Sequence, residues 1–139
     1  MVVGLSALVL GLVAPALDGL LASQRLRTAS YDLVTDLTLA RSESLKRAAD
    51  VLMQPTTTGD WRGGWRLTTE TGELLAQRNP LGGSVQVLTA PAGVRFDARG
   101  YADASTPVKF GFSDGHGHLR CILLDPAGRP RSQATACNP

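Results

Sequence analysis

The sequence has few of the residues that catalysis and metal binding require. Its 139 residues include only two histidines, His116 and His118, which lie in the glycine-rich stretch that begins at Asp114. These three side chains could bind a metal, but a closed site needs about four ligands, and no compact partner set is visible. We therefore expect a solvated hairpin turn there. The carboxylates are dispersed, and Gly82-Gly83 is too short for a phosphate-binding loop. The sequence predicts neither an enzyme nor a metal or cofactor site.

Charge is absent from the first 17 residues, and glycine and proline are absent from residues 20–54. A helix needs about 20 mostly apolar residues to cross a bilayer, and residues 1–22 approach that length if Asp18 lies at the interface. A cleaved signal peptide is the alternative. However, no basic residue precedes the apolar run, and the helical pattern continues after it. We therefore predict a retained transmembrane segment, residues 1–22.

Residues 23–54 carry the pattern of an amphipathic helix, because apolar residues recur every three to five positions. The predicted buried stripe is Leu26, Ala29 or Ser30, Leu33, Leu37, Ala40, Leu45, Ala48 and Leu52. The charged residues that lie mostly off it are Arg25, Arg27, Asp32, Asp36, Arg41, Glu43 and Lys46. Only Pro15 interrupts the helical pattern before Pro55, so we expect a rod of roughly 75 Å, longer than a small soluble domain needs.

Beyond Pro55 the sequence changes to short apolar runs separated by turn residues. The predicted strands are Gly64–Thr69, Glu73–Arg78, Ser84–Thr89, Val94–Ala98, Val108–Ser113 and His118–Asp125. Their spacing, near ten residues, favours an antiparallel sheet with the amphipathic half-helix across one face. The predicted fold class is α+β, with a β-rich head at residues 55–139.

Two cysteines, Cys121 and Cys137, both lie near the C-terminal end of the sequence. In an exported chain such a pair indicates a disulfide, which would stabilise the fold by about 3 kcal/mol through loop entropy. It would hold the C-terminal tail against the last strand. A pair of free thiols is the alternative.

The formal net charge of +2 is too small to indicate a nucleic-acid ligand by itself. Arginine nevertheless dominates the basic residues, since Lys46 and Lys109 are the only lysines. Arg129 and Arg131 lie two residues apart, and in an extended segment they project to the same side. Two such guanidinium groups suit adjacent phosphates of a nucleic-acid backbone, although solvated loop residues are the alternative. Further basic residues would extend the patch if the fold brings them near: Arg120, Arg99, Arg95 and Lys109.

Five stretches of the sequence, taken in order, resemble the minor pilins and pseudopilins of type IV pili and type II secretion. The resemblance covers essentially the full length and is to the branch that includes FimT and GspH, with FimT the nearest. The stretches are the Pro15-interrupted anchor with Arg25–Ala29, then Leu39–Arg47, Asp60–Trp65, Val94–Gly100 and Cys121–Arg131. That family begins with a short basic leader, a processing site before Phe and a glutamate in the anchor. None of these appears here, so we expect a start assigned downstream or a truncated chain.

The resemblance implies a single-pass protein of the inner membrane with its head in the periplasm. Prepilin peptidase would process the full-length precursor if it carries the leader. The subunit would then join a filament by packing its N-terminal helix against other pilin subunits. A Gly-Arg-x-Arg tail marks FimT-like minor pilins, which bind DNA during natural transformation. The resemblance therefore implies double-stranded DNA contacts at Gly128, Arg129 and Arg131, supported by Arg120 and more weakly by Lys109, Arg99 and Arg95.

Two hypotheses follow for the function. The first is a minor pilin that binds extracellular DNA without sequence preference. The second is a GspH-like subunit that primes or caps a pilus or secretion pseudopilus through protein contacts alone.

Overall fold

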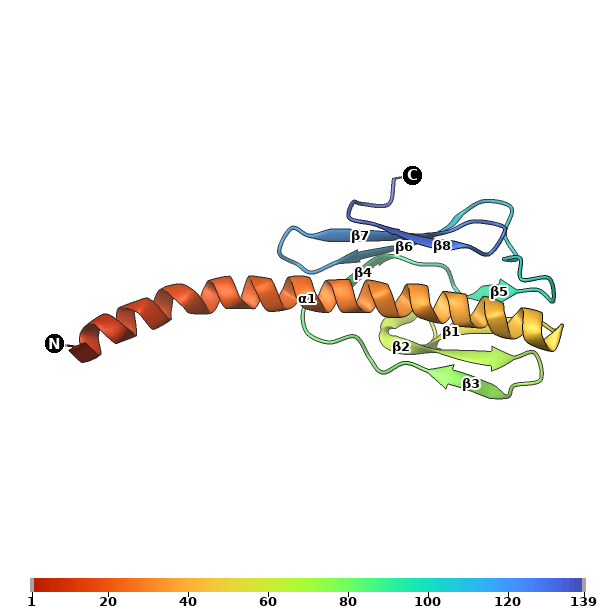
Figure 1. The fold of residues 1–139 in the computed structure, drawn as a ribbon, viewed down its shortest axis with the longest axis horizontal. Helices are drawn as coiled ribbons and strands as arrows, with labels where there is room; N and C mark the ends of the chain where they lie inside the picture. The colour runs from red at the N-terminus through yellow and green to blue at the C-terminus, as the bar shows by residue number, and fades with distance from the viewer. Residues whose placement is uncertain (1, 139) are drawn as a thin grey trace.

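One long helix lies across two antiparallel sheets of four strands each (Figure 1). The computed structural model describes the backbone of residues 2–138 and the side chains of residue 11 and residues 16–138. The elements are α1 (Val2–Arg47), β1 (Val51–Thr57), β2 (Asp60–Thr69), β3 (Leu74–Gln77), β4 (Gln86–Thr89), β5 (Val94–Phe96), β6 (Val108–Ser113), β7 (Leu119–Leu124) and β8 (Pro130–Gln133). This arrangement confirms the predicted α+β fold of a long helix packed on an antiparallel β head.

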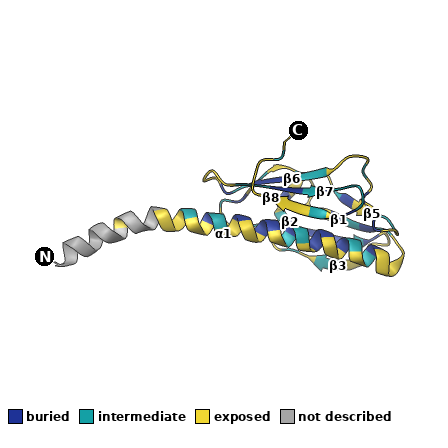
Figure 2. Ribbon diagram, turned by 45° about the horizontal axis from the view of Figure 1, so that its top comes forward, coloured by how far each residue is buried: buried dark blue, intermediate teal, exposed yellow. Residues whose placement is uncertain are grey.

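The second half of α1 packs on the sheets through the predicted stripe. Its buried residues are Ala22, Leu26, Ala29, Ser30, Leu33, Asp36, Leu37, Ala40 and Ser44, and in Figure 2 the buried positions of α1 lie on the side that faces the head. The N-terminal part of α1 extends beyond the sheets (Figure 1). Among the described residues, no helical segment is long and apolar enough to cross a membrane. The predicted transmembrane segment, residues 1–22, lies mostly outside the described side chains.

The predicted bounds of the helix are wrong at its C-terminal end and around Pro15. α1 continues unbroken through Pro15, since an interior proline removes one backbone hydrogen bond and a helix can continue past it. The helix stops at Arg47 rather than near residue 54, because Ala48 adopts a φ of 50° and a left-handed residue ends a helix. The side chains of Leu45 and Ala48, which we expected on the buried stripe, are exposed.

The residues after the helix form β1, a strand that the sequence analysis missed. Val51 and Met53 are fully buried and Leu52 between them is less so, a two-residue alternation that is typical of a strand. Leu52 had instead been assigned to the helical stripe. β1 pairs with β2 and β5 on its two sides and is therefore an inner strand of its sheet, although Pro55 lies within it.

The head contains two sheets rather than the one predicted. The strand orders are β3-β2-β1-β5 and β4-β6-β7-β8. β8 was not predicted as a strand, because Pro130 and the polar residues after it carry no apolar alternation. Aromatic side chains fill the space between the sheets and α1. Trp61 contacts Phe110 edge to face, with ring centroids 5.0 Å apart, and Trp65, Phe96 and Phe112 are fully buried.

Asp36 lies inside the core, although it was expected off the buried stripe. Its carboxylate, 5% exposed, accepts hydrogen bonds from the indole N–H of Trp65 at 2.8 Å and from the guanidinium of Arg78 at 2.8 and 3.0 Å. A buried charge requires such partners. The prediction failed because helical periodicity shows which positions face inward but not which distant residues neutralise them.

Candidate nucleic-acid interface

The predicted DNA-contacting tail is the hairpin of β7 and β8, whose turn lies at the end of the head away from the N-terminus (Figure 1). Leu124 pairs with Pro130 and Leu123 with Arg131. The turn is closed by two backbone hydrogen bonds, from Gly128 N–H to Asp125 C=O at 2.9 Å and from Asp125 N–H to Arg129 C=O at 3.2 Å. The Gly-Arg-x-Arg sequence is therefore part of an ordered hairpin.

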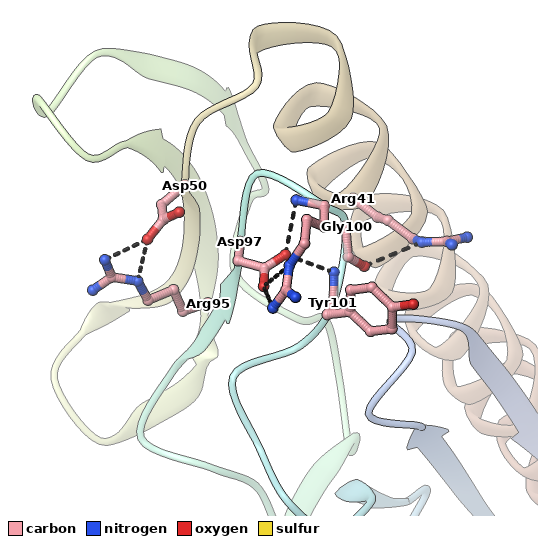
Figure 3. Close-up of polar contacts among 7 residues, drawn as sticks. Arg41, Asp50, Arg95, Asp97, Gly100 and Tyr101 are labelled. Carbon is pink, nitrogen blue, oxygen red and sulfur yellow. Dashed lines mark hydrogen bonds and ion pairs between the residues drawn. The ribbon is translucent and has the colours of Figure 1, made fainter.

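Gly128 has a structural reason to be glycine. Its φ is +83°, and a Cβ built on it would lie 2.1 Å from the carbonyl oxygen of Gly100 and 3.2 Å from Cδ of Arg41. Arg41 in turn donates from Nε to the same carbonyl at 3.2 Å (Figure 3). Gly128 is buried, so its role is to let the hairpin turn pack against the loop at Gly100.

Arg129 and Arg131 project from the outer face of the sheet, away from α1. Arg131 pairs with Leu123, whose neighbours on β7, Ile122 and Leu124, face the core. Arg129 lies two residues earlier in the same extended segment, so its side chain shares this face. The side chain of Arg129 is 71% exposed, and Arg131 is also exposed. The structure thus brings the two arginines together as the sequence suggested.

One carboxylate lies beside this pair. Asp125 receives Nε of Arg129 at 3.0 Å and the backbone N–H of Arg129 at 2.9 Å. The backbone N–H and the charge of Arg129 lower the pKa of Asp125 below its ordinary value. Asp125 therefore stays ionised and partly neutralises Arg129, so that a phosphate would have to compete with it.

Lys109 joins the same face. It lies opposite Leu123 on β6, in the same row across the sheet as Arg131. Its ammonium group donates a hydrogen bond to the backbone carbonyl of Asn138. Because a carbonyl carries no net charge, this contact does not neutralise Lys109. Lys109, Arg129 and Arg131 are hereafter called the outer cationic cluster.

Arg120 lies on the opposite face of the sheet from the outer cationic cluster. It shares the alternation of Ile122 and Leu124 and pairs with Phe112, all of which face α1 and the core. Its side chain lines a cleft with Arg27 of the helix. The face of a strand depends on register, which the sequence alone did not provide, so Arg120 was grouped with residues from which the sheet separates it.

Arg95 and Arg99 each lie against carboxylates, and Figure 3 shows Arg95 beside Asp50. Nε of Arg95 is 2.6 Å from Asp50, and a second nitrogen is 3.5 Å from Glu70. Arg99, 77% exposed, lies 2.8 Å from Asp97 and 5.1 Å from the ring centroid of Tyr101. Hydrogen bonding to Arg99 lowers the pKa of Asp97. These two arginines are therefore locally neutralised. Asp50 and Glu70 come from segments far from Arg95 in the sequence, whereas Asp97 lies only two residues before Arg99.

The predicted disulfide between Cys121 and Cys137 is present, with Cα atoms 5.0 Å apart. It holds the tail over the outer face of β6 and β7. Gly111 makes room for this arrangement, since a Cβ there would lie 2.9 Å from Cγ2 of Thr89 and 3.6 Å from Sγ of Cys137. The tail therefore forms one border of the outer cationic cluster.

The glycine-rich turn between β6 and β7 is organised by Asp114. This carboxylate is fully buried and accepts the backbone N–H groups of His116 at 2.7 Å and His118 at 3.1 Å, with Nδ1 of His118 at 2.6 Å. Burial alone would raise the pKa of Asp114, but the hydrogen bonds from His116 and His118 outweigh it and lower the pKa on balance. The side chain thus acts as the internal support of an exposed turn.

Asp114→Asn should lower the free energy of unfolding by about 2 kcal/mol at pH 7, because a charge-assisted acceptor is lost. The lowered pKa means that the carboxylate stabilises the fold above its unfolded pKa of about 4 and loses this effect as the pH falls. Urea unfolding at pH 7 and pH 3 should therefore show a difference from wild type that shrinks at the lower pH. Asp60→Asn, at the exposed first residue of β2, is the control. A difference that is equal at both pH values would contradict this role.

Comparison with known proteins places this architecture among the pilins. The fold is similar to that of the type IV minor pilin FimU of Pseudomonas aeruginosa strain PAO1. One crystal form gives a TM-score of 0.69 at 21% identity over 84% of this chain and 95% of that one. It is also similar to the minor pseudopilin EpsH from the type 2 secretion system of Vibrio cholerae, with a TM-score of 0.58 at 13% identity over 79% and 97% of the two chains. A comparison with curated proteins gave no match.

The fold class is therefore that of pilins and pseudopilins. The family model described as type II transport protein GspH matches residues 29–128, and the chain belongs to the GspH family. This family assignment agrees with the expectation of a pilus or pseudopilus subunit rather than an enzyme.

Proposed function

We propose that the protein is a FimT-like minor pilin that binds extracellular double-stranded DNA without sequence preference during natural transformation. Residues 1–22 anchor it in the inner membrane with the head in the periplasm, and α1 packs against other pilin subunits in the filament. Prepilin peptidase acts on the precursor if it carries a leader. The observation that carries the DNA proposal is the outward projection of Arg129 and Arg131 from one face of the β7–β8 hairpin.

The chemistry of this face suits a phosphate backbone. The Cα atoms of residues two apart along an extended strand are about 7 Å apart. This spacing is similar to that between successive phosphates of a nucleic-acid backbone. Lys109 adds a third positive charge across the sheet. Such contacts fix position without reading bases, and each neutralised phosphate releases counterions, so that affinity falls with salt.

Arg129→Ala/Arg131→Ala should weaken DNA binding by about tenfold or more, because two phosphate contacts are lost. It should also reduce the slope of log affinity against log salt by about 2. The measurement is a titration of labelled duplex with the full chain in an uncharged maltoside detergent, across a salt series. Arg62→Ala/Arg66→Ala is the matched control, since it removes the same charge from two exposed positions of β2.

Equal weakening by the two double variants would show that net charge, rather than the hairpin, determines binding. Absence of binding by the folded wild type at low salt would overturn the DNA proposal altogether.

The second candidate is a structural subunit that primes or caps a pilus or a secretion pseudopilus and does not bind DNA. The neutralisation of Arg129 by Asp125, of Arg99 by Asp97 and of Arg95 by Asp50 favours it, because paired cations contribute little to phosphate binding. In this case both double variants would leave filament assembly unchanged, and substitutions on the exposed face of α1 would impair it.

A further inference from the structure

A second basic site lies at the other end of the head, between α1 and the β6–β7 turn. This cleft has a volume of about 360 Å³ and is lined by Ser23 and Arg27 of α1, by His118 and Arg120 near the start of β7, and by Thr135 of the tail. Figure 1 shows the β6–β7 turn approaching α1 at the end of the head nearer the N-terminus. Three separate segments of the chain therefore build its walls.

The cleft holds positive charge without a matching carboxylate. Within the described part of the chain, its lining contains two arginines and no acidic residue, and neither guanidinium forms an ion pair with a described carboxylate. This distinguishes Arg27 and Arg120 from Arg95, Arg99 and Arg129, each of which has an acidic partner.

Two further features make the cleft suitable for an anion. Ser23 and Thr135 are among its lining residues, and a hydroxyl group can donate to oxygen. The nearest buried carboxylate, Asp114, is already bonded to the N–H groups of the turn and to Nδ1 of His118. Guanidinium and hydroxyl donors around a small cleft are the groups that recognise a phosphate.

We propose that this cleft binds a phosphate group, and that its source is the head group of an anionic phospholipid. The lipid assignment rests on the membrane anchor proposed above. That anchor ends at Ala22, and at 1.5 Å per residue Ser23 lies about 2 Å and Arg27 about 8 Å beyond it along the helix axis. The head-group region extends roughly 5–8 Å beyond the hydrocarbon core.

The direction of the side chains supports the same source. Side chains on a helix tilt towards its N-terminus, so Arg27 leans towards the end of α1 that carries the apolar residues. Exposed leucines flank this level of the helix, at Leu17, Leu20 and Leu21. Lipid phosphates lie just outside the apolar layer of a membrane, and two arginines at this level of the helix can contact them. Long basic side chains extend to reach the head-group region.

The test uses the full chain in an uncharged maltoside detergent, with the side-chain Nε–H signals of arginine recorded by NMR. The lipid and phosphate probes are dihexanoyl phosphatidylglycerol, the zwitterionic dihexanoyl phosphatidylcholine and inorganic phosphate, and duplex DNA is titrated in a separate series. We expect saturable shifts of the Arg27 and Arg120 signals with phosphatidylglycerol, which binds more tightly than the other two. Arg27→Gln/Arg120→Gln should weaken this binding by about tenfold or more, whereas Arg62→Gln/Arg66→Gln should leave it unchanged.

The outcomes separate the parts of the proposal. Inorganic phosphate binding as tightly as phosphatidylglycerol would support the phosphate site but overturn the lipid source. Unshifted Arg27 and Arg120 signals, or equal weakening by both double variants, would overturn the site itself. If duplex DNA shifts these signals more strongly than lipid does, the cleft belongs to a DNA interface and the lipid assignment is wrong. The DNA titration with the Arg129→Ala/Arg131→Ala variant measures the proposed DNA site independently. The lipid site and the DNA site can therefore fail or succeed separately.

Discussion

Asp36→Ala should lower the free energy of unfolding by about 3 kcal/mol. Removing one partner of a buried ion pair costs roughly 3–5 kcal/mol, because the remaining charge is left uncompensated. The lower value applies here since the side chain of Arg78 is 35% exposed and its guanidinium can recruit water. Trp65 is fully buried, so its indole N–H cannot replace Asp36 with a water molecule. An unsatisfied buried donor adds a further cost in free energy.

The measurement is urea unfolding of the full chain in maltoside detergent, followed by the fluorescence of Trp61 and Trp65. Asp32→Ala is the control, because Asp32 contacts the same arginine at 3.7 Å while 32% exposed. Exposed pairs of this kind contribute about 0–1 kcal/mol. Similar losses of unfolding free energy in the two variants would show that the buried contacts of Asp36 stabilise the fold no more than the exposed contact of Asp32.

Gly128→Ala should destabilise the protein by about 3 kcal/mol or more. An L-residue in the left-handed region costs about 1–2 kcal/mol, and here the added Cβ would also lie 2.1 Å from the carbonyl oxygen of Gly100. Backbone rather than a flexible side chain opposes it, so the turn has to move. We also expect weaker DNA binding, because the position of Arg129 depends on this turn.

Gly72→Ala separates the two causes. Gly72 has a φ of +92° in the turn after β2, but a Cβ there would meet nothing within 4 Å, so only the cost of the conformation remains. Urea unfolding should therefore show a clearly smaller loss for Gly72→Ala than for Gly128→Ala. Equal losses would mean that the contact between the hairpin turn and Gly100 is unimportant.

The elements that could be predicted are those fixed by local pattern. The buried stripe from Leu26 to Ala40 follows helical periodicity, and β6 has the predicted bounds, Val108–Ser113, because turn residues delimit it on both sides. The boundary between α1 and β1 was missed, since Leu52 satisfies the helical period and the alternation of a strand equally well. Burial against β2 and β5, which decides the matter, is a tertiary effect.

The candidate site divided along similar lines. That Arg129 and Arg131 share a face follows from their spacing in the chain. The separation of Arg120 from them depends on the register of β7, and the neutralisation of Arg95 depends on Asp50, which is far away in sequence. The cleft at Arg27 was missed because its two arginines, Arg27 and Arg120, are far apart in the sequence, and no local signal joins them.

The unbroken course of α1 has a geometric consequence for the head. The stripe from Ala22 to Ala40 fixes the sheets to one side of the helix. The head therefore has a fixed rotational orientation about the helix axis relative to the N-terminal half of α1. A helix turns by about 100° per residue. Deleting one residue between positions 16 and 21 would therefore swing the outer cationic cluster by about 100° around the axis. In a filament whose subunits are held by their N-terminal halves, the same deletion would rotate every head about its helix axis. The outer cationic cluster would then face a different direction, although the fold of the head would be unchanged.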